Sequence, residues 1–214
     1  MDEDISIINT GTRIERIKEF FIKNKKNLFI ILSLIIFLII GYFAYQEFDK
    51  AKKTDIADQY NLASIKFLSG KKLSVENEMI NIVKKKDKTY SPLALYFLID
   101  NNIINSQEKI NNLFDILINE ANLDNEIKDL IIYKKALYNS EFISESDLLK
   151  NLQPILNSDS IWKSHTLYLL GEYFLSKNEK NKAKEFFEKI LVLENSNIKI
   201  KQEAQKRINR DLSE

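Results

Sequence analysis

The chain of 214 residues contains no cysteine and only one histidine, His165. Without thiols it can form no disulfide, perform no thiolate catalysis and bind no zinc through cysteine. Its four glycines and two prolines are too few for the closely spaced turns of an all-β domain, and it has no glycine-rich phosphate loop. The sequence therefore predicts an all-α protein that is not an enzyme and has no catalytic, cofactor-binding or metal-binding residues.

Charge is absent from one stretch and balanced elsewhere. Residues 1–27 carry six Lys or Arg and five Asp or Glu, residues 28–45 carry neither, and residues 46–214 carry 26 of each sign. A protein that binds nucleic acid presents a basic face, and residues 46–214 have no surplus of positive charge from which to build one. Neither nucleic acid nor a small-molecule substrate is an expected partner.

Residues 28–45 form an apolar run in which 13 of 18 residues are Leu, Ile or Phe. As a helix this run is about 27 Å long, close to the roughly 30 Å hydrocarbon core of a bilayer. We therefore expect a single transmembrane helix, with a buried core helix and a cleaved signal peptide as alternatives. An uncleaved anchor is favoured because the run is long for a signal peptide and no small-x-small cleavage site follows Gly41.

The residues that flank this run predict its orientation. Six Lys or Arg lie within residues 13–26, against three, Lys50, Lys52 and Lys53, shortly after the run. The positive-inside rule places the more basic side in the cytoplasm. Residues 1–27 are then a cytoplasmic tail, and residues 46–214 lie across the membrane.

The cytoplasmic tail contains a second helical signal. Residues 12–15 match a capping box, and Ile14, Ile17, Phe20 and Phe21 follow at helical spacing beside basic residues. An amphipathic helix of this kind lies either at the membrane surface or in solvent as a lead-in to the anchor.

Beyond Gln46 the apolar residues recur at helical spacing almost throughout. Ser91 is the expected N-cap of a helix that has Pro92 at its first position, and Pro154 should bend or end another. Short loops join the helices, which favours antiparallel pairs and an α-solenoid of about four pairs plus a C-terminal capping helix. The nine predicted helices cover residues 48–68, 74–86, 93–101, 106–120, 125–138, a stretch from about 146, 160–175, 180–193 and 196–210.

One helix pair carries a repeat motif. Leu170-Gly171-x-x-Phe174 followed by Ala183-x-x-x-Phe187 matches the tetratricopeptide (TPR) pattern, including its internal spacing. Gly171 and Ala183 are small and allow the two helices to approach closely, while Phe187 fills the space beside them. These five residues are therefore the predicted repeat-packing residues, and the upstream pairs are expected to be TPR-like.

The repeat register predicts a binding groove, because the first helix of each TPR pair lines the concave face. Ala136, 35 residues before Gly171, marks the equivalent position of an earlier repeat. Tyr133 and Tyr168 are expected to lie along one groove that recognises peptides, the alternative being that such side chains belong to the core, as is expected of Trp162. The candidate groove residues are Leu130, Tyr133, Leu137, His165, Tyr168 and Glu172.

Several segments together resemble a known family. They are Arg13-Ile14-Glu15-Arg16-Ile17, the single apolar run with Tyr42, Phe43 and Tyr45 leaving it, the stretch 57–64 and Ser91-Pro92-Leu93-Ala94-Leu95. The chain is similar over nearly its full length to the TPR-domain ancillary subunits of the bacterial SecYEG translocon, the YfgM-like proteins. The resemblance implies a bacterial inner-membrane protein with a periplasmic TPR domain, whose partners are translocon subunits, periplasmic chaperones or unfolded emerging chains.

The expected function is therefore that of a membrane-anchored TPR protein that assists protein translocation or periplasmic folding. A periplasmic scaffold for assembly or cell division is an alternative of the same class. An enzyme, or the membrane subunit of one, is an alternative of a different class, and it would need a cleft with convergent polar groups and perturbed carboxylates.

Overall fold

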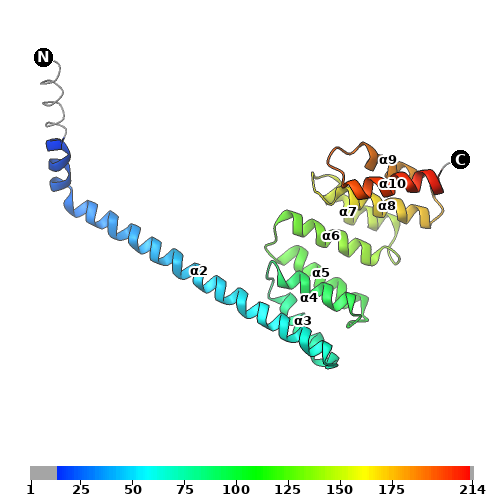
Figure 1. Cartoon of the computed structure of the whole chain (residues 1–214), viewed down its shortest axis with the longest axis horizontal. Coiled ribbons are helices and arrows are strands. Elements are labelled where there is room, and N and C mark those ends of the chain that lie inside the picture. The colour runs from blue at the N-terminus through cyan, green and yellow to red at the C-terminus, as the bar shows by residue number, and fades with distance from the viewer. Residues whose placement is uncertain (1–13, 213–214) are drawn as a thin grey trace, which may run out of the picture. The chain divides into compact units, whose positions relative to one another are not determined.

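The computed structural model describes residues 14–212, which form ten helices and contain no strand (Figure 1). The all-α prediction is confirmed, whereas the first two residues of the predicted capping box lie outside the described part. A leading helix over residues 14–23 precedes the labelled helices. These are α2 (Lys25–Leu68), α3 (Lys72–Lys84), α4 (Tyr90–Asp100), α5 (Gln107–Glu120), α6 (Asn125–Asn139), α7 (Glu145–Leu156), α8 (Lys163–Ser176), α9 (Lys180–Val192) and α10 (Ile198–Asp211).

The chain forms two compact units that divide between Asp55 and Ile56, ten residues beyond the predicted end of the membrane segment. The described part of the first unit consists of the leading helix and the beginning of α2. From Ile56 onward the chain forms the second unit, called here the distal domain. Helix α2 is a single element of 44 residues, so the helices predicted over 28–45 and 48–68 are continuous.

Helix α2 is long and apolar enough to cross a membrane. Its most apolar stretch has no buried residue, and Phe37, for example, is 77% exposed. A core helix of the same composition would bury these side chains against the rest of the protein. The exposure of the whole stretch therefore argues against the core-helix alternative.

The helices of the distal domain form two layers. The end of α2 and helices α4, α6, α8 and α10 follow one another in the first layer, and α3, α5, α7 and α9 belong to the second. In the first layer, successive helices or their ends are joined by a ring contact, Tyr60–Phe97, and by the hydrogen bonds Lys88–Asp124, Trp162–Glu126 and Arg207–Glu172. In the second layer they are joined by the hydrogen bonds Lys109–Glu76 and Lys182–Glu145.

The contacts within each layer recur at a regular distance along the sequence. Six hydrogen-bonded pairs, including Asn197 with Ser164, join residues that are 33 to 37 positions apart. A regular separation of this size is expected when each helix pair stacks on the preceding pair. The packing of consecutive helices is therefore that of a helical repeat.

Two clusters of buried apolar side chains make up the core, and they divide along α6. Ile131 belongs to the first cluster, which contains Phe114, and Ala136 belongs to the second, which contains Phe174 and Phe187. Both clusters draw on several helices, so no single pair holds a core of its own.

A buried polar network joins α5 to α6 beside this division. Asn139 is only 5% exposed, and its Nδ2 donates to Oδ1 of Asn111 at 2.7 Å and to the carbonyl of Lys135 at 2.8 Å. Its Oδ1 accepts hydrogen bonds from Gln107 Nε2 at 2.9 Å and from Asn111 Nδ2 at 3.0 Å. The buried amide thus has partners for both of its polar atoms, as burial requires.

The prediction that Ser91 caps α4 is wrong. The carboxylate of Asp87 accepts the backbone N–H groups of Thr89 and Tyr90 at 2.9 and 2.7 Å, and the helix begins at Tyr90. The hydroxyl of the buried Ser91 instead donates to the carbonyl of Ile82 at 2.6 Å and fastens α4 to α3. Pro92 remains in the first turn, where a missing N–H breaks no helical hydrogen bond.

Most other helix boundaries lie within one or two residues of their predicted positions, whereas α8 begins three residues after its predicted start at residue 160. Ser106, the first residue of the helix predicted over 106–120, is the N-cap of α5, and Gly70 has a positive φ of 85° after α2. Ser144 caps α7 in place of the predicted start near residue 146, and Asn197 caps α10. Pro154 lies in the last turn of α7, which ends two residues later.

Helices α8 and α9 pack closely through Gly171. A Cβ atom at this position would lie 2.5 Å from Cε1 of Phe187, so only glycine fits under the ring without a shift. All five predicted repeat-packing residues are buried, and Phe187 is fully buried. The ring therefore has little room to move away.

We expect replacement of Gly171 by alanine to lower the free energy of unfolding by about 1–3 kcal/mol, because a methyl group would overpack the site. Urea unfolding of the full-length protein in detergent measures this, followed by the fluorescence of Trp162, the only tryptophan. Gly41→Ala is the matched control, since nothing lies within 4 Å of its added Cβ. An unchanged midpoint for Gly171→Ala would contradict the packing described.

Candidate functional site

The six candidate groove residues lie on two neighbouring helices of the first layer. Leu130, Tyr133 and Leu137 come from α6, and the other three come from α8. Five of them are partly buried, while Leu137 is 42% exposed. Four of the six, Tyr133, His165, Tyr168 and Glu172, belong to two places that differ in chemistry.

The first place is an aromatic cluster between α6 and the start of α8. The ring of Tyr133 stacks on that of Trp162, with centroids 6.1 Å apart and an angle of 19° between the planes. The ring of His165 lies 5.1 Å from Trp162 and 6.1 Å from Tyr133, centroid to centroid. Three rings, from α6 and from the start of α8, are therefore in mutual contact and are called here the aromatic cluster.

Trp162 contributes more to this site than the sequence predicted. It does pack against the preceding pair, as expected of a core residue, and its Nε1 donates to the carbonyl of Glu126 at 3.0 Å. However, it is only partly buried and lines a surface pocket together with His165 and with Ile161, Asn195 and Asn197. Trp162 precedes His165 by three residues, and residues at this spacing lie on the same side of a helix. This spacing is the signal in the sequence that could have identified Trp162 as part of the site.

The aromatic cluster carries no net charge at neutral pH. Burial lowers the pKa of the His165 imidazole. Burial raises the pKa of the Tyr133 hydroxyl. Both side chains are therefore neutral at pH 7, which suits contacts with uncharged groups.

The second place contains Tyr168 and Glu172, and helix α10 covers it. Arg207 Nε lies 2.6 Å from Glu172 Oε1, and its Nη2 donates to Oε2 at 2.7 Å. Arg207 Nη1 also lies 3.0 Å from Oδ2 of Asp211. The ring of Tyr168 packs edge-on against Phe187, with centroids 5.4 Å apart.

This second place stays ionised over the physiological pH range. Contacts with the Tyr168 hydroxyl and with Asp211 raise the pKa of Arg207, and Arg210 and Arg207 hold the pKa of the Asp211 carboxyl far below its usual value. Tyr133 and Tyr168 thus have different partners, and the described residues show no ring contact between them. Farther along α8, a ligand at the aromatic cluster would reach Glu172, whose carboxylate is already paired with Arg207.

The aromatic cluster offers three rings in mutual contact. Within residues 14–212, no group of three or more His, Asp or Glu side chains is arranged to hold a metal ion. Aromatic rings with polar tips offer a large contact area and a hydrogen-bonding edge. The face can therefore hold an apolar side chain of a partner.

We expect Arg207→Gln to lower the free energy of unfolding by about 1.5–3 kcal/mol, because the partly buried Glu172 would lose its charged hydrogen bonds. Arg210→Gln is the matched control, since the Arg210 side chain is 68% exposed and its loss should cost less than about 0.5 kcal/mol. Urea unfolding of the two full-length variants in detergent compares them. Equal losses would show that the Glu172 contact does not fasten α10.

Comparison of the chain with protein families, with curated proteins and with solved structures finds no match.

Proposed function

We propose that this chain is a membrane-anchored interaction protein without enzymatic activity. In this proposal α2 crosses the bacterial inner membrane, the N-terminus lies in the cytoplasm, and the distal domain lies in the periplasm. The distal domain is a TPR-like solenoid that assists protein translocation or folding by binding translocon subunits, chaperones or emerging chains.

Three features support a TPR-like solenoid with a capping helix. The separations of 33 to 37 residues bracket the 34-residue TPR period. The close packing of Gly171 on Phe187 involves two positions of the TPR pattern. The outward side of α10 is mainly polar, with exposed Lys199, Lys201 and Lys206, as a terminal capping helix requires.

The aromatic cluster is the single observation that carries the binding proposal. Tyr133, Trp162 and His165 form a neutral, partly exposed surface across two repeats. Two exposed apolar side chains lie nearby in the sequence, Leu137 on α6 and Ile161 in the turn before α8, and Ile161 lines a pocket with Trp162 and His165. Rigid aromatic residues of this kind dominate the energetics of protein interfaces.

The anchoring part of the proposal predicts a defined membrane topology. Because no charged residue interrupts residues 28–45, we expect the protein to stay in the membrane fraction after carbonate extraction and to need detergent for release. A reporter fused after Glu214 should be active only outside the cytoplasm. A reporter active in the cytoplasm, or a protein in the aqueous fraction, would contradict the anchor and its orientation.

The binding part predicts site-specific crosslinks in the native cell. A photoreactive phenylalanine analogue in place of Leu137 should capture translocon subunits, periplasmic chaperones or exported chains. The same analogue in place of Val192, an exposed apolar residue on α9 of the second layer, is the matched control and should capture none of them. Crosslinks from position 137 to division or envelope-assembly proteins would favour the scaffold alternative. Identical crosslinked proteins at positions 137 and 192 would exclude this face as the binding surface.

A further inference from the structure

The leading helix has one strongly apolar side. Ile14, Ile17 and Phe21 recur at positions i, i+3 and i+7, and Phe20 lies beside them on the helical wheel. Each of these four side chains is between 54% and 57% exposed. A helix in water gains nothing from such a stripe, so its apolar side needs a partner.

The charges around this stripe are mostly positive. Residues 14–26 contain Arg16, Lys18, Lys23, Lys25 and Lys26 against two glutamates. Three of the five cations lie within four residues, where the leading helix ends and α2 begins. The partner of this surface should therefore be apolar and carry negative charge at its boundary.

Asn24 separates the leading helix from α2. Its side-chain Nδ2 and its backbone N–H both donate to the carbonyl of Phe20, each at 3.0 Å. Two donors therefore share one helix carbonyl at Asn24, where the regular helix is interrupted by a turn. The leading helix over residues 14–23 is thus a separate element from α2.

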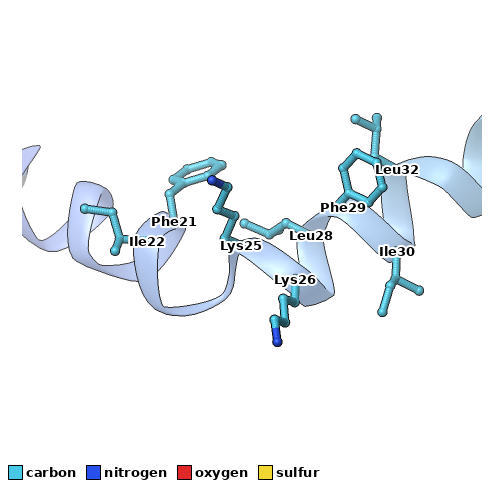
Figure 2. A pocket seen from close by; sticks show the side chains of 8 residues that line it. All are labelled: Phe21, Ile22, Lys25, Lys26, Leu28, Phe29, Ile30 and Leu32. Carbon is cyan, nitrogen blue, oxygen red and sulfur yellow. The ribbon is translucent and has the colours of Figure 1, made fainter.

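The junction exposes an apolar concavity with cations at its edge. Phe21, Leu28, Phe29 and Leu32 contribute to its lining together with Lys25 and Lys26. Figure 2 shows Lys25 on the same side of the ribbon as Phe21 and Phe29, and Lys26 pointing to the other side. Ammonium groups therefore extend on two sides of one short apolar segment.

We propose that residues 14–26 bind the surface of a bilayer that contains anionic phospholipids. The stripe of Ile14, Ile17, Phe20 and Phe21 enters the boundary between headgroups and acyl chains, and Lys23, Lys25 and Lys26 bind lipid phosphates. The inference rests on the proposed function, because it needs α2 to be inserted in the same bilayer. Lysine stems pack along apolar groups while their ammonium groups reach the headgroups.

The absence of cysteine allows a direct test on the full-length protein. Ile17→Cys is labelled with the fluorophore NBD, and the protein is reconstituted in vesicles of phosphatidylcholine or of equal parts phosphatidylcholine and phosphatidylglycerol. With phosphatidylglycerol the emission should shift to the blue and be quenched by lipids spin-labelled near the headgroup. The same label at Lys201→Cys, an exposed position on α10, should behave as a probe in water.

A charge-matched pair of variants tests the role of the cations. Replacing Lys23, Lys25 and Lys26 by glutamine should abolish most of the blue shift, and high salt should act in the same way. Replacing Lys50, Lys52 and Lys53 by glutamine, on the other flank of residues 28–45, should leave the shift unchanged.

The outcomes separate this inference from the anchor itself. A water-like spectrum at residue 17 in protein that co-floats with the vesicles would overturn the surface helix and leave the anchor intact, whereas failure to co-float would overturn the anchor. A shift that is equal in phosphatidylcholine alone would overturn recognition of anionic headgroups. A shift that depends on the protein-to-lipid ratio would assign the stripe to a second copy of the chain.

Discussion

A helix pair in the distal domain cannot bury its apolar residues alone, and the packing of each pair on the next follows from this constraint. The first buried cluster extends from Ile56 at the end of α2 to Ile131 on α6, and the second continues from Ala136 to Leu212. Each helix packs one of its sides against a neighbouring helix. Contacts between equivalent helices therefore recur at nearly constant separations along the sequence. The outward side of α10 is mainly polar, with exposed Lys199, Lys201 and Lys206.

Stacking of this kind leaves the relative position of successive helices open, and polar groups restrict it. Asn139 meets Asn111 and Gln107 between α5 and α6, where all the polar atoms of its amide have partners. Sliding one helix along the other would separate these groups and leave buried amides without hydrogen bonds, which is costly. The Ser91 hydroxyl restricts α4 against α3 in a similar way through the carbonyl of Ile82.

The elements that sequence analysis predicted best are those whose signal is local. Apolar spacing located the helices, and the helix predicted over 106–120 begins one residue before α5, at its N-cap Ser106. The cap predicted at Ser91 was wrong, because the carboxylate of Asp87 accepts the N–H groups at the start of α4 and the serine lies buried between two helices. No helix-ending residue lies between residues 45 and 48, so the sequence left open whether the span continues into the next helix, and the structure shows a single helix α2.

The candidate site was predictable only in part, for a physical reason. Counting repeat positions predicted that Tyr133 and Tyr168 lie along one groove; in the structure the ring of Tyr133 contacts that of His165, whereas Tyr168 packs against Phe187. Such counting does not reveal which side chain reaches across from a later helix. Arg207 lies 35 residues beyond Glu172 and forms an ion pair with it. No local sequence pattern predicts this ion pair.

The division of this face into a neutral and an ionic half limits where a partner can bind. A ligand at the Glu172 end would have to displace Arg207 from two carboxylates, so it would have to replace charged hydrogen bonds that already exist. A ligand at the aromatic cluster displaces only water, and its apolar groups gain contact with rings that neighbouring helices already hold in place. Under the proposed function, recognition is therefore concentrated at Tyr133, Trp162 and His165, while the ionic half serves to hold α10 on the last repeat.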